Sequence, residues 1–456
     1  LLMMLLSALA CLAAELLANS EINLRLYPEI LGKIALSLTL LGALFSVFHT
    51  LCRSPLTAAA CCVATLLLKY TPLSDKLGLT HTMWNIAGSP LQPADAYWHF
   101  EQSQSVFWPF MTFWLLLSIA LLWLAARWSH RSGSFTNPKR WTLNLSSSLL
   151  LILAVMSGVH LHLNIIAERP LMSSDLREQW RANYEQRYAS WAGVAQPTLT
   201  HIDAQVDIYP KLGEAVFALH YTLKNQTAQP ISELLVGNYS ATPIDELKLS
   251  VAHTASRDQQ LGQYTLRLAN ALMPGETLQM HSKLSFKQPK HWPAVMPQFV
   301  KPSFSYLRGM PLLPSIGFQM AYKLRDEQQR RHYGLAPLDL AKPSTLFATP
   351  QRTAASYDWV TLRSVVSTAD GQTPLAQGKL IKQWQQQGRN YAEFQTSTPI
   401  RNLPVWYSLA GDSLSQQQGD VTLTVYSPQL NAAAKLNMQA MQDTLGWMTQ
   451  HIAPYR

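Results

Sequence analysis

Charged side chains are scarce in the first third of this 456-residue chain. Over the whole chain they make up 14% of the residues, against roughly 25% in a typical soluble domain. Residues 1–166 contain nine basic residues (Lys and Arg) and six acidic residues (Asp and Glu). Residues 167–456 contain 27 basic and 21 acidic residues, so the shortage of charge is confined to the first third. The net charge of +9 is scattered rather than clustered, which argues against a nucleic-acid partner.

Cysteines and catalytic motifs are also few. The four cysteines all lie in or beside the apolar runs of the first third, so the polar remainder uses no disulfide. The sequence lacks HExxH, GxxxxGK, GxSxG and GxGxxG, the signatures of a helical zinc site, a P-loop, a nucleophile elbow and a dinucleotide site. We therefore predict no catalytic residue, no metal ligand and no cofactor within this chain.

The first third is instead rich in apolar residues. Five stretches are long enough, or nearly so, to cross a lipid bilayer as helices, namely 1–18, 34–52, 55–70, 105–126 and 143–163. The segment RWSHRSGSFTNPKRW, between the fourth and fifth stretches, contains four basic residues, a pattern typical of a cytoplasmic loop. We predict an integral protein of the inner or plasma membrane with residues 167–456 outside the cytoplasm. Because the first run has no polar flank, we also expect the natural protein to continue upstream.

An amphipathic helix is predicted directly after the apolar third, within a linker at 167–196. Its apolar residues recur at helical spacing: Leu176, Trp180, Tyr184, Tyr188 and Trp191. Such a helix either lies on the lipid surface or packs against the domain that follows, and the sequence alone does not choose between these.

After Pro197 the apolar period changes from 3.6 to 2. The segments 202–208 and 217–223 alternate on either side of a turn, which predicts an antiparallel hairpin. Further alternating runs occur at 231–237, 246–252, 263–269, 277–286, 357–366, 376–384, 391–396 and 420–426. We predict a multi-span helical membrane domain followed by an all-β domain of the β-sandwich type. The segment 291–335 is rich in proline and glycine, but its aromatic residues favour an ordered loop, and an amphipathic helix is predicted near the end of the chain.

Several stretches resemble a known arrangement. MWNIAGSPLQPADAYWHF, the basic loop and GVHLHLN are similar to the last part of an ABC-type export permease. ANYEQRYASWAGVAQPTLTHIDAQVDIYP resembles the start of an aminopeptidase N-like zinc metallopeptidase, which one branch of such permeases carries as a fusion. LLPSIGFQMAYKLRDEQQRRHYGL resembles a stretch that these fused proteins share. The resemblance covers most of residues 80–456.

The resemblance implies a division of the chain into four parts. Residues 1–166 would be the permease-like part, 167–196 the linker, and 197–430 the saddle-like N-terminal β-domain of the peptidase. Residues 431–456 would be a helix that leads into a catalytic domain beyond Arg456, where the zinc ligands would lie. Members of this family hold the free amine of the substrate with a TQxE-like segment. In PQFV, Gln298 fits the glutamine as a substrate-binding residue, but Val300 stands where the carboxylate should be.

Two functions follow as expectations. The first is export or handling of peptides by a permease that works with a separate ATP-binding subunit and is surrounded by membrane lipid. The alternative is a membrane-anchored zinc aminopeptidase whose catalytic domain lies beyond Arg456, or a non-catalytic binding module. Whether the full-length protein is an enzyme stays open at the level of sequence.

Overall fold

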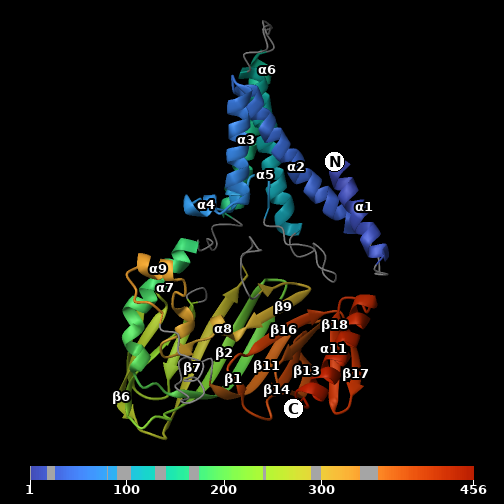
Figure 1. Ribbon diagram of the computed structural model, residues 1–456. Coiled ribbons are helices and arrows are strands. Elements are labelled where there is room, and N and C mark those ends of the chain that lie inside the picture. Colours follow the sequence, from blue (N-terminus) through green and yellow to red (C-terminus); the bar gives the residue numbers. More distant parts are fainter. Residues whose placement is uncertain are drawn as a thin grey trace. The chain divides into compact units, whose positions relative to one another are not determined.

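The computed structural model describes residues 2–17, 26–79, 81–89, 104–128, 140–163, 174–239, 243–288, 299–338 and 358–455 (Figure 1). Residues 174–288 and 296–412 form one compact unit. The apolar helices and the last part of the chain lie outside that unit, and each part is described by itself.

Helices form where the apolar stretches predict them. They are α1 (Leu2–Leu17), α2 (Leu26–Leu51), α3 (Pro55–Tyr70), α4 (Leu73–Lys76), η1 (Thr82–Trp84), α5 (Gln104–Trp128) and α6 (Arg140–Leu161). Among the described residues, two helical stretches are long and apolar enough to cross a membrane, Tyr27–Leu51 and Phe107–Ala126. The helical region is thus confirmed, and two of the five predicted spans meet that criterion.

The segment 81–89 fits closely against several of these helices. Trp114 of α5 donates a hydrogen bond from Nε1 to the carbonyl of Gly88 at 3.0 Å. Lys69 of α3 donates to the side-chain oxygen of Asn85 at 2.8 Å. His81 stacks on His162 with ring centroids 5.2 Å apart. Residues 81–89 are therefore held against the helical region by contacts with α3, with α5 and with His162.

The other compact unit is rich in β-strands. Its strands are β1 (Thr198–Tyr209), β2 (Glu214–Lys224), β3 (Ile231–Gly237), β4 (Ile244–Leu249), β5 (His253–Asp258), β6 (Gln263–Leu272), β7 (Thr277–Lys287), β8 (Phe299–Val300), β9 (Phe304–Arg308), β10 (Ser315–Ile316), β11 (Trp359–Ala369), β12 (Gln372–Ala376), β13 (Lys379–Gln386), β14 (Arg389–Gln395), β15 (Ile400–Arg401) and β16 (Val405–Ala410). The helical elements of this unit are α7 (Ser174–Tyr188), η3 (Ala189–Gly193), α8 (Gly309–Leu312), η4 (Met320–Tyr322) and α9 (Glu327–His332).

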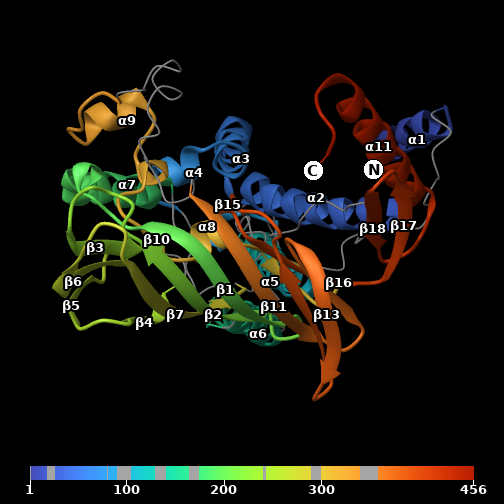
Figure 2. The same cartoon turned by 90° about the horizontal axis from the view of Figure 1, so that it is seen from below.

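These strands form three sheets. The largest has eight strands in the order β13-β14-β11-β1-β2-β7-β4, with β15 paired to β11, and Figure 2 shows its strands side by side. Two four-stranded sheets have the orders β10-β3-β6-β5 and β12-β16-β9-β8. One continuous core contains residues from all three sheets, among them Ile202, Leu234 and Trp406. One face of the large sheet is thus covered by the two smaller ones. The predicted β-rich region is confirmed, with its strands divided among several sheets.

Periodicity explains the longest strands. In β1, Ile202, Ala204 and Val206 are fully buried, and the residues between them face the other way. The predicted hairpin is also confirmed, because β1 and β2 pair antiparallel around the turn at 210–213. One pairing is unusual for a chain of hairpins. Strand β11 lies parallel to β1, with His201 opposite Thr361.

The amphipathic helix α7 packs against the β-rich unit. Trp180, Tyr184 and Tyr188 are buried in one cluster with Phe318 and Tyr322. Of the two placements that the sequence left open, the structure therefore has the helix on the domain.

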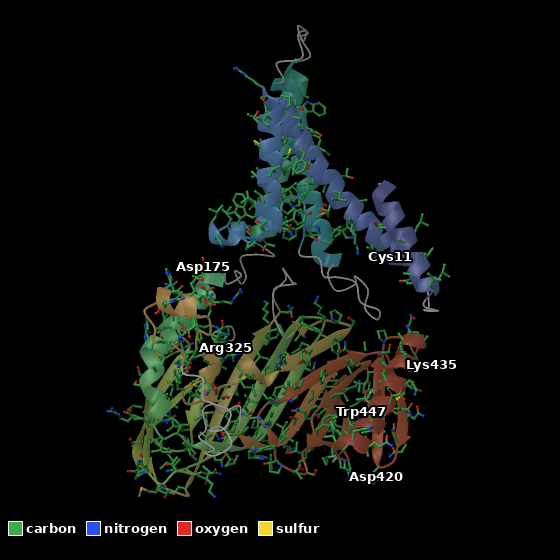
Figure 3. The ribbon with its side chains drawn as sticks, in the orientation of Figure 1. Cys11, Asp175, Arg325, Asp420, Lys435 and Trp447 are labelled. Atoms are coloured by element: carbon green, nitrogen blue, oxygen red, sulfur yellow. The ribbon has the colours of Figure 1, made fainter. Side chains whose placement is uncertain are left out.

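The last part of the chain forms a hairpin and a helix. Strands β17 (Asp412–Gln418) and β18 (Val421–Ser427) pair with each other, and α11 (Ala432–His451) follows them. Ala434 and Met438 of α11 pack on Leu423 and Val425 of β18. Trp447, labelled on this helix in Figure 3, is 56% exposed.

Candidate functional site

The predicted substrate-binding residue, Gln298, lies outside the described residues. The chain is described again from Phe299, where β8 pairs with β9 and Val300 lies opposite Ser305. Val300 is 1% exposed and belongs to the main core. Val300, which the resemblance aligns with a carboxylate, is thus a buried aliphatic residue of the core.

The chain then turns a tight corner from β9 through α8 into β10. The amide of Gly309 donates to the carbonyl of Pro404 at 2.7 Å. A Cβ atom on Gly309 would lie 2.5 Å from Cγ of Pro404, so only glycine fits here without a shift. Beyond β10, Gly317 has a φ of +75° and donates to the carbonyl of Leu235 at 2.7 Å. The two glycines set the path of the corner.

Strand β10 is the edge strand of its sheet. Ser315 and Ile316 pair with Gly237 and Val236 of β3. The side chain of Gln319 donates to the carbonyl oxygens of Ile316 and Gly317, at 2.9 and 3.1 Å. This amide therefore caps the end of the edge strand and fixes its position.

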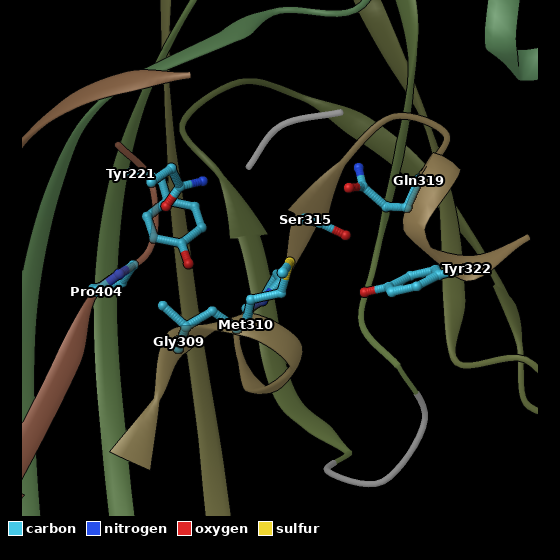
Figure 4. Close-up of a pocket in the computed structure, with 10 residues that line it drawn as sticks. Tyr221, Gly309, Met310, Ser315, Gln319, Tyr322 and Pro404 are labelled. Atoms are coloured by element: carbon cyan, nitrogen blue, oxygen red, sulfur yellow. The ribbon is translucent and has the colours of Figure 1, made fainter. Parts of the chain in front are cut away.

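A small pocket lies beside this corner. Its volume is about 30 Å³, enough for one or two water molecules. Figure 4 shows Ser315, Gln319 and Tyr322 on one side of it and Tyr221, Gly309 and Pro404 on the other. The remaining lining residues are Met310, Leu313, Pro314 and Asn402.

The polar groups around the pocket are neutral. Burial raises the pKa of Tyr221, and it raises the pKa of Tyr322 to about 12, so both phenols keep their protons at neutral pH. The other polar lining side chains are a hydroxyl and two amides, Ser315, Gln319 and Asn402. A buried ammonium group needs an opposite charge, and no lining residue supplies one. The pocket can exchange hydrogen bonds with a neutral group but does not select a cationic amine.

Helix α7 holds this corner from outside. The backbone amide of Gln319 donates to the hydroxyl of Tyr184 at 2.8 Å. Arg181 donates to the carbonyl oxygens of Ala321 and Lys323, at 3.2 and 3.1 Å. The linker helix thus fixes the segment that follows β10.

A buried ion pair completes the support. Arg330 of α9 binds both carboxylate oxygens of Glu185 on α7, at 2.9 and 2.8 Å. Burial alone would raise the pKa of Glu185, but the hydrogen bonds from Arg330 and the charge of Lys323 outweigh it and hold this pKa below its ordinary value.

Within the part of the chain that the structure describes, no three His, Cys, Asp or Glu side chains come together as a metal ion would require.

Comparison with known proteins gives a limited likeness. No family model and no curated protein matches the chain. An M1 zinc metallopeptidase from Deinococcus radiodurans, bound in one structure to a Tyr-Ser-Ala substrate, is 14% identical with a TM-score of 0.38, over 57% of this chain and 54% of that one. A two-domain M1 zinc metallopeptidase with bound L-tryptophan is 13% identical with a TM-score of 0.38, over 57% of this chain and 55% of that one.

The chain spans about half the length of the solved structures that it matches. With no family match, the permease resemblance gains no support from these comparisons.

Proposed function

We propose that this chain is the membrane-anchored portion of an aminopeptidase N-like zinc peptidase, in which residues 197–430 hold a peptide for a catalytic domain outside residues 1–456. Support for the anchor comes from Tyr27–Leu51 and Phe107–Ala126, which have the length and composition of membrane spans. In this proposal the zinc ion belongs to the catalytic domain, and this chain supplies none of its ligands.

The observation that carries the proposal is the corner at 299–322. The segment LPSIGF, residues 313–318, contains the edge strand β10 beside a small neutral pocket. Edge strands bind extended peptides by accepting them as an additional strand. Because Gln319 already donates to the carbonyl of Ile316, a bound peptide would replace that amide with its own N–H group.

The apolar surface of α11 also supports a further domain. Its exposed apolar residues include Leu436 at 69% and Ile452 at 65%, in addition to Trp447. A helix that packs one face on a hairpin and presents apolar residues elsewhere is typical of an element covered by a partner. We propose that the catalytic domain covers this surface.

The neutral pocket changes the expected specificity. With Val300 buried and no carboxylate among the residues that line the pocket, the pocket offers no negative charge to the amine of a substrate. We propose that peptides are held by their backbone, and that a free amino terminus gives no advantage in binding here.

The deciding experiment uses the natural protein, purified from membranes through an affinity tag inserted in the exposed turn at Lys211. We expect about one zinc ion per molecule and hydrolysis of peptides that stops when a chelator removes the metal and returns when zinc is restored. N-acetylated peptides should be cleaved at internal bonds about as well as free ones. A natural protein with neither zinc nor peptidase activity would refute the proposal.

A further inference from the structure

The large sheet has a hollow on the face that points away from the core. Side chains alternate along β1, so that Asp203 and Gln205 face outward while Ala204 and Val206 are buried. The hollow has a volume of about 580 Å³, within the roughly 300–1,000 Å³ of small-molecule sites. It is lined from six strands, β1, β2, β7, β11, β13 and β14, by residues that include Asp203, Gln205, His220, Arg363, Trp384 and Tyr391.

The floor of this groove is an ordered grid of side chains. Because the strands are in register, Asp203 lies opposite His220, which lies opposite His281. In the next row Thr222 lies opposite Gln279. The backbone groups below them belong to the ladders of the sheet. A ligand on this face is therefore recognised by side-chain donors and acceptors alone.

The two lining residues of fixed charge, Asp203 and Arg363, pair with each other. Arg363 donates to both oxygens of Asp203, at 3.1 and 3.0 Å, and to Glu393 at 2.8 Å. The residues that line the groove therefore carry no net fixed charge.

One end of the groove is aromatic. Trp384 of β13 stacks on Tyr391 of β14, with ring centroids 5.2 Å apart and an angle of 14° between the rings. Toward the other end, His220 and His281 meet edge to face at 4.3 Å. Lys382 also places its ammonium group over the Trp384 ring, 5.0 Å from the ring centroid. The groove therefore combines aromatic rings at one end with neutral hydrogen-bonding groups along its floor.

We propose that this groove binds a neutral oligosaccharide. The hydroxyl groups of a sugar both donate and accept, so they match amide, imidazole and hydroxyl side chains, and the C–H face of a sugar ring is an apolar surface that packs on an indole ring. An extended peptide is a poorer match, because peptides bind sheets along strand edges through backbone hydrogen bonds. The inference does not depend on the proposed peptidase function.

The test is a titration of the full chain with chitotetraose and cellotetraose, followed by calorimetry. The chain is kept in lauryldimethylamine oxide, since maltoside detergents carry a sugar headgroup that would compete. We expect saturable binding of at least one of the two sugars. Trp384→Ala should weaken it at least about five-fold, the effect of losing one aromatic contact. Trp447→Ala, which removes an exposed tryptophan of α11, should leave it unchanged.

A second variant guards against misfolding. Gln205→Ala alters an exposed side chain of the groove and should also weaken binding, while circular dichroism confirms that the sheet is intact. The proposal is overturned if the unmodified chain binds neither sugar, or if both groove variants bind as tightly as the unmodified chain. It is also overturned if an unstructured peptide binds in the groove with the same dependence on Trp384 and the sugars do not displace it.

Discussion

At the scale of single residues, the most unusual group near the corner is Lys301. Lys301 is 6% exposed, and burial lowers the pKa of its ammonium group to about 8. An unfolded lysine has a pKa near 10.4. Between these values the unfolded chain binds more protons than the folded chain, so folding stability must rise as the pH rises from about 8 to about 10.

We therefore expect Lys301→Met to stabilise the β-rich unit at pH 7 by roughly 2–3 kcal/mol, and to remove the gain that the unmodified chain shows between pH 8 and 10. Urea unfolding of the full chain in detergent, followed by pulse proteolysis, measures both effects. Lys211→Met, at an exposed turn, is the matched control and should change neither. Equal pH dependence in the Lys301 variant and the unmodified chain would contradict the assignment.

The ion pair between Glu185 and Arg330 gives a second prediction. Arg330 is 1% exposed, so Arg330→Met leaves the carboxylate of Glu185 buried without its main partner. We expect a loss of about 3–5 kcal/mol in unfolding free energy. Arg267→Met breaks the pair with Glu233 at the surface, where the arginine side chain is 73% exposed, and should cost less than about 1 kcal/mol. Similar losses for the two variants would mean that burial does not determine the strength of the pair.

At the scale of elements, the corner between β9 and β10 depends on close contact with the segment before β16. Gly309→Ala places a methyl group against Pro404 and should destabilise the unit by about 1–3 kcal/mol. Gly193→Ala, where nothing lies within 4 Å of the added carbon, should be close to neutral. The melting temperatures of the two variants are compared with that of the unmodified chain. If Gly309→Ala left the melting temperature unchanged, the contact between Gly309 and Pro404 would be able to open without cost.

Elements also show how much the sequence could predict. Alternation located β1, β2, β6 and β7 within a few residues, because one face of each is buried. It missed β8, β10 and β15, since two residues cannot display a period. The aromatic stripe located α7, but its contact with Phe318 joins parts of the chain that lie far apart, and no local pattern identifies such a partner.

The candidate site was harder to predict than the strands. Its lining comes from β2, α8, β10, η4 and the segment at 402–404, which only the tertiary fold brings together. The sequence singled out Gln298, which lies outside the described residues. It predicted an ordered loop at 291–335, whereas the described part of that segment, from Phe299, contains β8, β9 and β10. Tyr221 gave no signal, because it looks like any other inward residue of β2.

At the scale of the whole molecule, orientation in the membrane remains the central prediction. The basic loop should be cytoplasmic and the β-rich unit should be on the opposite side. After replacement of the four native cysteines by serine, Ser132→Cys, in the loop outside the described residues, should react with an impermeant maleimide only in opened cells. Ser415→Cys, in exposed β17, should react in intact cells or spheroplasts. The reverse pattern would place the β-rich unit in the cytoplasm.

The parallel pairing of β1 with β11 has a consequence for biosynthesis. His201 and the side chain of Thr361 that it contacts are 160 residues apart. At about 5–20 residues per second, the ribosome needs roughly 8–30 s to deliver the second after the first. Throughout that interval the twelve-residue strand β1 lacks its neighbour on one edge, so the backbone N–H and C=O groups of that edge are unpaired. Such an edge can pair with a strand of another chain. We therefore expect newly made chains to be able to pair with one another along this edge until β11 has been synthesised.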